Sequence, residues 1–168
     1  TSYMYYSACT SRSPFMAKFN GMLFVTRGDH RMWGGQYWNI NSAALYHPLL
    51  QANLPELVQP YYDTYSRMYD ASALAAQQQW NCDGIFIPGT VPFNGLERLP
   101  ENIADELADL VLLNKPWSER SSTFNDYLPR PLGSGRWNFR GKSSAPFSYV
   151  VHVYNTNAKI AFEYWRKY

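Results

Sequence analysis

Two asparagines, Asn39 and Asn41, stand one residue apart in the segment WGGQYWNINSAALYHP, at the start of an apolar stretch that predicts a helix. In an extended segment, residues i and i+2 point to the same side, so both amides could address one ligand together with Tyr37. Each amide offers a carbonyl acceptor and two N–H donors, which suits sugar hydroxyls or a bound water. The alternative is that one asparagine caps the helix and the other is unrelated to it.

An amide does not take up a proton at neutral pH, so acid–base chemistry at this place also needs a carboxylate. Glycosidic bonds are usually cleaved by a pair of carboxyl groups. Asp29, Asp83 and Glu97 lie in Gly-rich aromatic loops and are the candidates, although acidic residues in such turns are more often structural. Six further carboxylates occupy surface-type positions on predicted helices, which indicates solvated faces: Asp63, Asp70, Glu101, Asp105, Glu106 and Asp109.

Other kinds of site have little support in the sequence. It contains no phosphate loop, dinucleotide fingerprint, Gly-Xaa-Ser-Xaa-Gly elbow or His-Glu-Xaa-Xaa-His motif. His30, His47 and His152 are far apart and have no cysteine or histidine at metal-ligand spacing, so no metal and no cofactor is predicted. The net charge of +2, carried by scattered basic residues, does not indicate a nucleic acid partner, and no apolar run reaches the length of a membrane span.

The composition predicts one folded globular domain, because hydrophobic residues make up 46% of the 168 residues and charged residues only 17%. Aromatic residues make up 17%, including 14 tyrosines. Rings beyond the needs of a core often line concave sites, and the alternative is a tyrosine-rich helical core. Cys9 and Cys82 are expected as two buried thiols, because two cysteines in a domain of this size require no disulfide.

The elements that must position these residues are helices. Hydrophobic periodicity predicts them over residues 2–11, 41–51, 53–80 with a kink at Pro60, 100–113 and 148–168. Long Gly, Pro and aromatic loops join them at 15–38, 81–99 and 114–144, and residues 85–87 could form a short strand. This pattern predicts an all-α architecture, closer to a toroid of helical hairpins than to a simple bundle. Both chain ends fall inside predicted helices, which indicates a piece of a longer protein.

Two stretches, YYSACTSRSPFMAKFNGMLF and WGGQYWNINSAALYHPLLQANLPEL, resemble the catalytic domain of glycoside hydrolase family 95, the inverting α-L-fucosidases and their relatives. The likeness is best over residues 3–60. It implies an (α/α)6 barrel, of which residues 1–168 would form roughly the N-terminal half, since twelve helices with their loops need a much longer chain. The matching positions are Ser11-Arg12, Ala17, Asn20-Gly21, Tyr37, Asn39-Ile40-Asn41, Tyr46 and Pro48.

The resemblance also implies roles for individual residues. Asn41 would position the attacking water and Asn39 would assist it or bind sugar, while an aspartate base and a glutamate acid would lie beyond residue 168. The walls that stack on the sugar and bind its hydroxyls would come from Trp33, Tyr37, Trp38 and His47.

The sequence departs from the family pattern at several of these places. His47 stands where the family has tryptophan, and Ala43, Ala44 and Leu45 replace polar residues. The segment IFIPGTVPF, at residues 85–93, replaces a polar segment that contacts substrate in the family. Two functions therefore stay open: an inverting hydrolase of an α-linked, fucose- or galactose-like sugar, and a catalytically inactive carbohydrate-binding or scaffold relative. A helical interaction domain unrelated to sugars is a third interpretation.

Several expectations follow for the whole protein. The 168-residue chain alone should be inactive, and uncovered apolar helix faces should make it associate. The expected partners are an oligosaccharide or polysaccharide and the remainder of the barrel, with neither nucleic acid nor a membrane among them. A periplasmic or extracellular location is expected from the resemblance alone.

Overall fold

The computed structural model describes residues 2–17, 37–127 and 156–167 of the chain, and most of these residues are helical. This confirms the all-α prediction. The elements in chain order are α1 (Ser2–Thr10), β1 (Tyr37–Trp38), α2 (Asn39–Gln51), the 3-10 turn η1 (Pro55–Leu57), α3 (Gln59–Arg67), α4 (Tyr69–Trp80), β2 (Thr90–Val91), α5 (Glu101–Val111), the 3-10 turn η2 (Trp117–Glu119), α6 (Ser122–Tyr127) and α7 (Thr156–Lys167).

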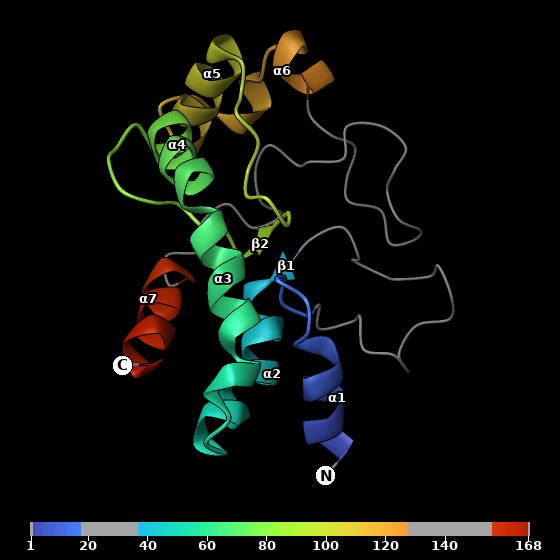
Figure 1. Ribbon diagram of the computed structural model, residues 1–168. Coiled ribbons are helices and arrows are strands. Elements are labelled where there is room, and N and C mark those ends of the chain that lie inside the picture. The colour runs from blue at the N-terminus through green and yellow to red at the C-terminus, as the bar shows by residue number, and fades with distance from the viewer. Residues whose placement is uncertain (1, 18–36, 128–155, 168) are drawn as a thin grey trace.

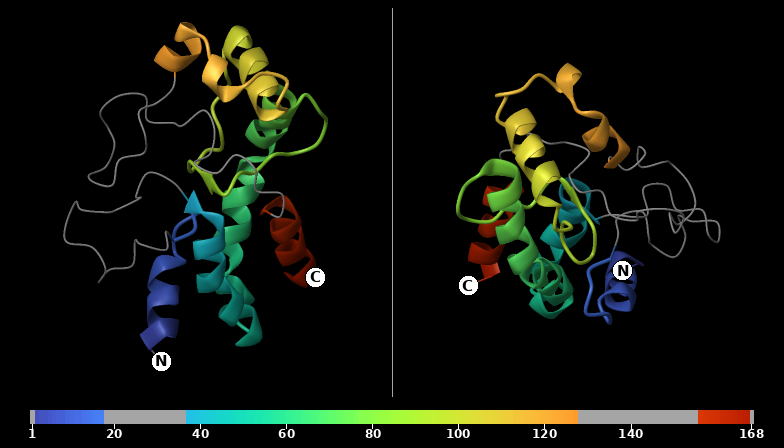
Figure 2. Two further views of the ribbon diagram at one scale, coloured as in Figure 1. Left: turned by 180° about the vertical axis from the view of Figure 1, so that it is seen from behind. Right: turned by 90° about the horizontal axis from the view of Figure 1, so that it is seen from above.

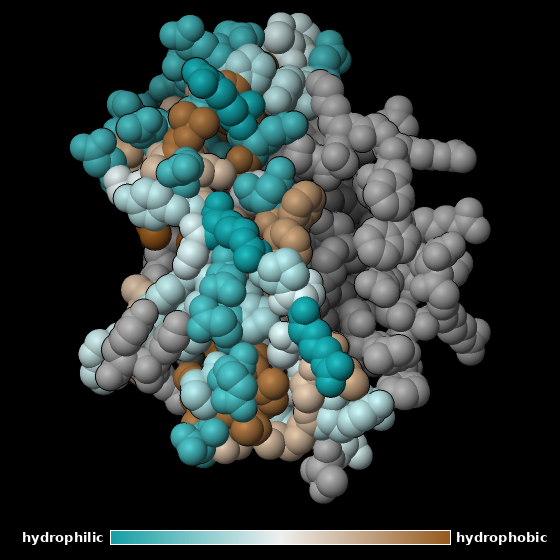
Figure 3. All heavy atoms as spheres, viewed as in Figure 1, coloured by the Kyte–Doolittle hydropathy of each residue, from teal (hydrophilic) through white to brown (hydrophobic). Residues whose placement is uncertain are grey.

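The helices gather in two groups. In Figure 1 and Figure 2, α1, α2, α3 and α7 lie in one half, and α4 runs on from α3 toward α5 and α6 in the other. Each half has its own cluster of buried apolar side chains, and Trp80 at the end of α4 packs against both. On the face in Figure 3, hydrophilic residues run down the centre, where Figure 1 places α3 and α4. The outer face of this helix pair is therefore solvated while its inner face forms the core.

Tyrosines form much of the first cluster. Tyr46 of α2 packs on Tyr61 of α3 with ring centroids 5.2 Å apart, and Tyr61 packs on Tyr65 at 5.0 Å. Tyr164 of α7 lies 4.9 Å from the Tyr62 ring, and its hydroxyl donates a 2.6 Å hydrogen bond to the Tyr62 carbonyl. The tyrosine-rich core considered from composition is thus confirmed for these rings.

The long helix expected over residues 53–80 is divided into η1, α3 and α4. Pro55 and Pro60 each lie at the first positions of a new element, because proline has no N–H to offer in a helix interior. The second break is at Met68, where the N–H bonds to the Tyr65 carbonyl, three residues back, at 3.1 Å. The prediction of one continuous helix with a kink at Pro60 was therefore wrong.

The loop between α4 and α5 does not contain the strand considered at residues 85–87. Instead, β2 pairs antiparallel with β1 in the register Tyr37↔Val91 and Trp38↔Thr90. Phe86 and Ile87 are buried in the first cluster, and the Phe86 N–H donates to the Ser72 carbonyl at 2.9 Å. Anchored on α4 in this way, the loop reaches the start of α2.

The second half is held together around Glu106 of α5. Its side chain is 13% exposed, and it accepts hydrogen bonds from Lys115 Nζ at 2.8 Å and from the Ser121 N–H at 2.7 Å. The expectation of a solvated carboxylate was wrong here because this residue ties η2 and α6 to α5. Cys9 is half-buried and Cys82 exposed, both as free thiols, so the expectation of two buried thiols was also wrong.

Candidate site at the start of helix α2

Helix α2 begins at Asn39, two residues before the predicted start, so Asn39 and Asn41 both lie in its first turn. In a helix, residues i and i+2 are separated by about 200° of rotation, so their side chains point to different sides. Asn39 is 1% exposed, whereas Asn41 faces solvent. The prediction that both amides point to one side was therefore wrong, as was the capping alternative: Trp38 is the N-cap residue and no side chain caps the helix.

The nitrogen of the Asn39 amide lies near two tyrosine hydroxyls from α3. Its Nδ2 lies 3.4 Å from Tyr61 Oη and 3.3 Å from Tyr65 Oη, and these tyrosines are one helical turn apart. The Asn39 backbone N–H donates to the Gly89 carbonyl at 3.0 Å. Within the described residues, the amide oxygen Oδ1 has no hydrogen-bond partner.

The pairing of β1 with β2 brings a distant loop to this place. Strand β2 lies within residues 85–93, the segment that departs from the family pattern. The bond from Asn39 to Gly89 joins the same segment to the first turn of α2. The start of α2 and residues 89–91 are therefore adjacent in the fold.

The other residues proposed to bind the sugar differ in their burial and in their position along the chain. Tyr37 is 5% exposed and belongs to the core, while Trp38 is half-buried beside Asn39. His47 is half-buried on α2, about 12 Å along the helix axis from Asn39, so the structure does not bring it to the same end. Trp33 lies outside the described residues.

The candidate carboxylates do not join the asparagines in the described structure. Asp83 is exposed in the turn that follows α4, and Glu97 is exposed in the loop before α5. In the part of the chain that is described, neither hydrogen-bonds Asn39 or Asn41. Asp29 lies outside the described residues.

Three buried phenols around the site, those of Tyr37, Tyr46 and Tyr65, remain neutral at physiological pH because burial raises their pKa. Burial raises the pKa of Tyr46 to about 12, and the pKa of Tyr37 is raised by the same cause. Burial also raises the pKa of Tyr65, and the hydrogen bond from Asn39 offsets only part of that effect. The described side chains can therefore hold a ligand by neutral hydrogen bonds, but a proton acceptor would have to come from elsewhere.

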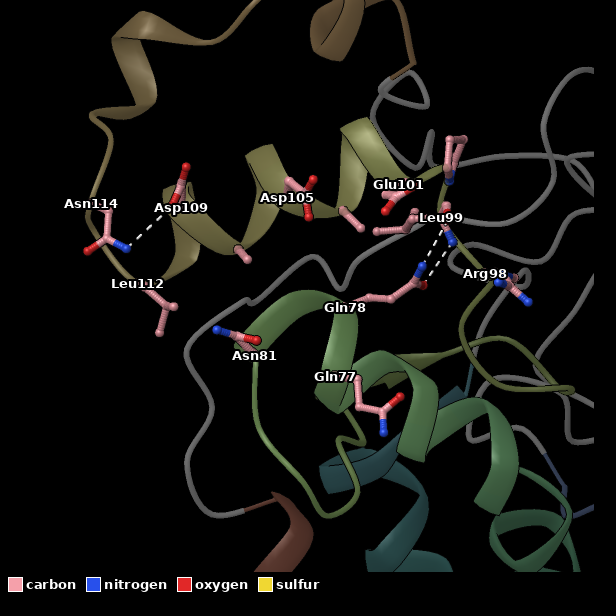
Figure 4. Close-up of a pocket in the computed structure, with 13 residues that line it drawn as sticks. Gln77, Gln78, Asn81, Arg98, Leu99, Glu101, Asp105, Asp109, Leu112 and Asn114 are labelled. Atoms are coloured by element: carbon pink, nitrogen blue, oxygen red, sulfur yellow. Dashed lines mark hydrogen bonds between the residues drawn. The ribbon is translucent and has the colours of Figure 1, made fainter.

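A separate groove, which sequence reasoning missed, lies between α4 and α5 (Figure 4). The Gln78 side chain spans its base, donating to the Leu99 carbonyl and accepting from the Leu99 N–H, both at 2.9 Å. No local pattern marks such a groove, because the residues that meet across it are far apart in the sequence, as Gln78 and Leu99 are at 21 positions. Its volume is about 660 Å³, and it is lined by Gln77, Gln78, Asn81, Arg98, Leu99, Pro100, Glu101, Ala104, Asp105, Ala108, Asp109, Leu112 and Asn114.

The carboxylates of this groove follow one face of α5. Glu101, Asp105 and Asp109 recur every four residues, and the Asn114 Nδ2 lies 3.4 Å from Asp109 Oδ1. Across the described ranges, no group of three His, Cys, Asp or Glu residues is arranged to hold a metal ion. No helix in the same ranges is both long and apolar enough to cross a membrane.

Comparison with known proteins returns no relative for this chain. No family model matches it, and neither a curated protein nor a solved structure does so.

Proposed function

We propose that this chain is the N-terminal half of an (α/α)6 barrel in an inverting glycoside hydrolase that acts on an α-linked, fucose- or galactose-like sugar. In this proposal Asn41 positions the attacking water, and Asn39, which is buried on the other side of the first turn, assists by holding that turn in place. An acid and a base from outside residues 1–168 transfer the protons, and their separation leaves room for the water, as inversion requires.

The observation that carries the proposal is the meeting of residues 37–41 with residues 85–91 at the start of α2. The first segment carries the family resemblance, and the second stands where that family has a polar segment that contacts substrate, although almost fifty positions separate them in the sequence. A buried amide oxygen without a partner among the described residues at the same place supports a site for a small hydrogen-bond donor. The mainly helical architecture is compatible with half of a helical barrel.

A second function is supported by the segment IFIPGTVPF at residues 85–93. Phe86, Ile87 and Val91 are buried in the core, so this segment offers few polar side chains to a sugar. A protein that kept the barrel, bound carbohydrate and lost the hydrolysis would fit this substitution.

The test compares Asn41→Ala with Asn102→Ala in the full-length protein, with 4-nitrophenyl α-L-fucoside and α-galactoside as substrates. Asn102 is a suitable control because it is also an exposed asparagine in the first turn of a helix, α5. We expect Asn41→Ala to lower kcat about 100-fold, because the water loses its orientation. Its free energy of unfolding should change by less than about 0.5 kcal/mol.

Asn102→Ala should leave both quantities unchanged, and proton NMR of the first product should show inversion at the anomeric carbon. Full activity of Asn41→Ala would disprove the role of Asn41. Binding of oligosaccharides without hydrolysis by the wild-type full-length protein would favour the carbohydrate-binding function instead.

A further inference from the structure

We propose that the groove between α4 and α5 binds a linear aliphatic polyamine, whose ammonium groups meet the carboxylates of α5 one after another. The groove is separate from the start of α2, so this inference does not rest on the proposed function. Its volume of about 660 Å³ lies in the range of small-molecule sites.

The charge of the groove is negative, although the charge of the whole chain is not. Glu101, Asp105 and Asp109 line it, and Arg98 is the one basic residue among its described lining residues. The complete sequence has a net charge of +2. A cation is therefore attracted to this groove in particular and not to the protein surface in general.

The chain itself supplies little compensation for this row of carboxylates. Among the described residues, the side chains of Glu101 and Asp105 form neither an ion pair nor a hydrogen bond, and Asp109 meets only the Asn114 amide, at 3.4 Å. Like charges four residues apart destabilise a helix. On another side of α5, by contrast, Glu106 is paired with Lys115 at 2.8 Å. A bound cation would relieve the repulsion along the row.

A second row on the same helix is apolar. Ala104, Ala108 and Leu112 also line the groove and also recur every four residues, beside the carboxylate row. Each step of four residues advances about 6 Å along the helix axis, so the wall repeats a carboxylate and an apolar side chain at that interval. A polyamine repeats an ammonium group and a few methylene groups in the same way. Its methylenes can lie on the apolar row while its ammonium groups meet the carboxylates.

The ends of the groove differ in charge. Figure 4 shows Arg98 near the start of α5 and Asn114 beside Asp109 at the other end, with Gln77 and Asn81 of α4 on the facing wall. Side-chain amide oxygens accept hydrogen bonds from an ammonium group, whereas a guanidinium repels it. The polyamine is therefore expected toward the Asp109 end.

A lysine-rich peptide has the same ammonium groups on aliphatic chains, but the groove is less suited to its backbone. The N–H and the carbonyl of Leu99, which could pair with a peptide backbone, are both bonded to Gln78 at 2.9 Å. This favours a ligand without a backbone of amides.

The test measures the binding of spermidine to the full-length protein by isothermal titration calorimetry at low salt. The wild type is compared with the double variant Asp105→Asn/Asp109→Asn. The matched control is Asp70→Asn/Asp126→Asn, which removes the same charge from two exposed carboxylates outside the groove. Urea unfolding of both double variants checks that each remains folded.

We expect the groove variant to bind spermidine about tenfold more weakly than the wild type, and the control to stay within about twofold. Arg98→Gln should bind it about threefold more tightly, because a repulsive charge is removed. Equal losses in the two double variants would overturn the site, since they would indicate attraction by total charge alone. Weaker binding by Arg98→Gln would overturn the cationic ligand.

Two further ligands test the chemical class. The diol of the same chain length, in which hydroxyls replace the terminal ammonium groups, should not bind, and binding as tight as that of spermidine would overturn the role of charge. Tighter binding of trilysine, lost in the same groove variant, would overturn the polyamine in favour of a lysine-rich peptide. If spermidine does not bind the wild type, the proposal fails. Hydrolysis of α-glycosides bears only on the proposed function, so the two failures are distinguishable.

Discussion

Asn39 and Asn41 have the same side chain and are two positions apart, yet their surroundings give them different chemistry. Asn39 is buried, and its amide Nδ2 lies within hydrogen-bond distance of the Tyr61 and Tyr65 hydroxyls. Asn41, on the opposite side of the first turn, is exposed and can rotate to meet a ligand. At the scale of the residue, the motif therefore combines a buried amide with an exposed one.

Glu106 gives a prediction of pH dependence at the same scale. Burial raises the pKa of its carboxyl, but the hydrogen bonds from Lys115 and Ser121 outweigh this effect and lower the pKa from 4.5 to about 2. A carboxyl whose pKa is lower in the folded chain stabilises the fold above its unfolded-state pKa, and this stabilisation is lost as the pH falls toward the folded-state pKa. We expect the free energy of unfolding to fall between about pH 5 and about pH 2.5, and to fall less in Glu106→Gln.

Urea titrations at several pH values check this, with Glu101→Gln as the control because Glu101 is an exposed carboxylate of the same helix. The control should keep the pH dependence of the wild type. If Glu106→Gln and the wild type lose stability in parallel, the carboxylate does not act as the structure indicates.

At the scale of the elements, the loop between α4 and α5 depends on Gly95. Its φ is +85°, and a Cβ atom there would lie 2.7 Å from Ala71 Cβ on α4. Gly84 is a matched control, because its φ is +116° but no heavy atom lies within 4 Å of the position of its Cβ. Both alanine variants should lose about 1–2 kcal/mol of unfolding free energy to the positive φ, and Gly95→Ala should lose about 1–3 kcal/mol more to the clash. Equal losses in urea unfolding would mean that the loop can move away from α4.

Local sequence patterns were sufficient to predict helices α1 and α5. The ends of α1 and α5 fall within two residues of their predicted positions, since periodicity and Pro100 mark them. The pairing of β1 with β2 and the bond of Gln78 to Leu99 could not be predicted, because they join residues that are far apart in the chain. The early start of α2 was missed for a different reason: its N-cap residue is Trp38, and no capping side chain marks the start of the helix. The arrangement in a barrel stays a prediction.

At the scale of the whole molecule, α7 has apolar residues on two sides. Ile160 is 4% exposed and Tyr164 packs on Tyr62, so one side faces the core. On another side, Phe162 is 51% exposed and Trp165 is 71% exposed, with their rings stacked at 5.6 Å. A surface helix of a monomer normally has one apolar stripe, and a second stripe with large aromatic rings favours contact with another apolar surface.

We therefore expect the 168-residue chain to self-associate through α7. In sedimentation velocity, its weight-average mass should rise above 19.5 kDa as concentration increases. The double variant Phe162→Gln/Trp165→Gln should stay near the monomer mass, because glutamine keeps the helix but removes the aromatic surface. Tyr5→Gln is the control, since Tyr5 is 66% exposed on α1 and should have no effect on the mass. Association of the double variant as strong as that of the wild type would assign the contact to another surface of the molecule.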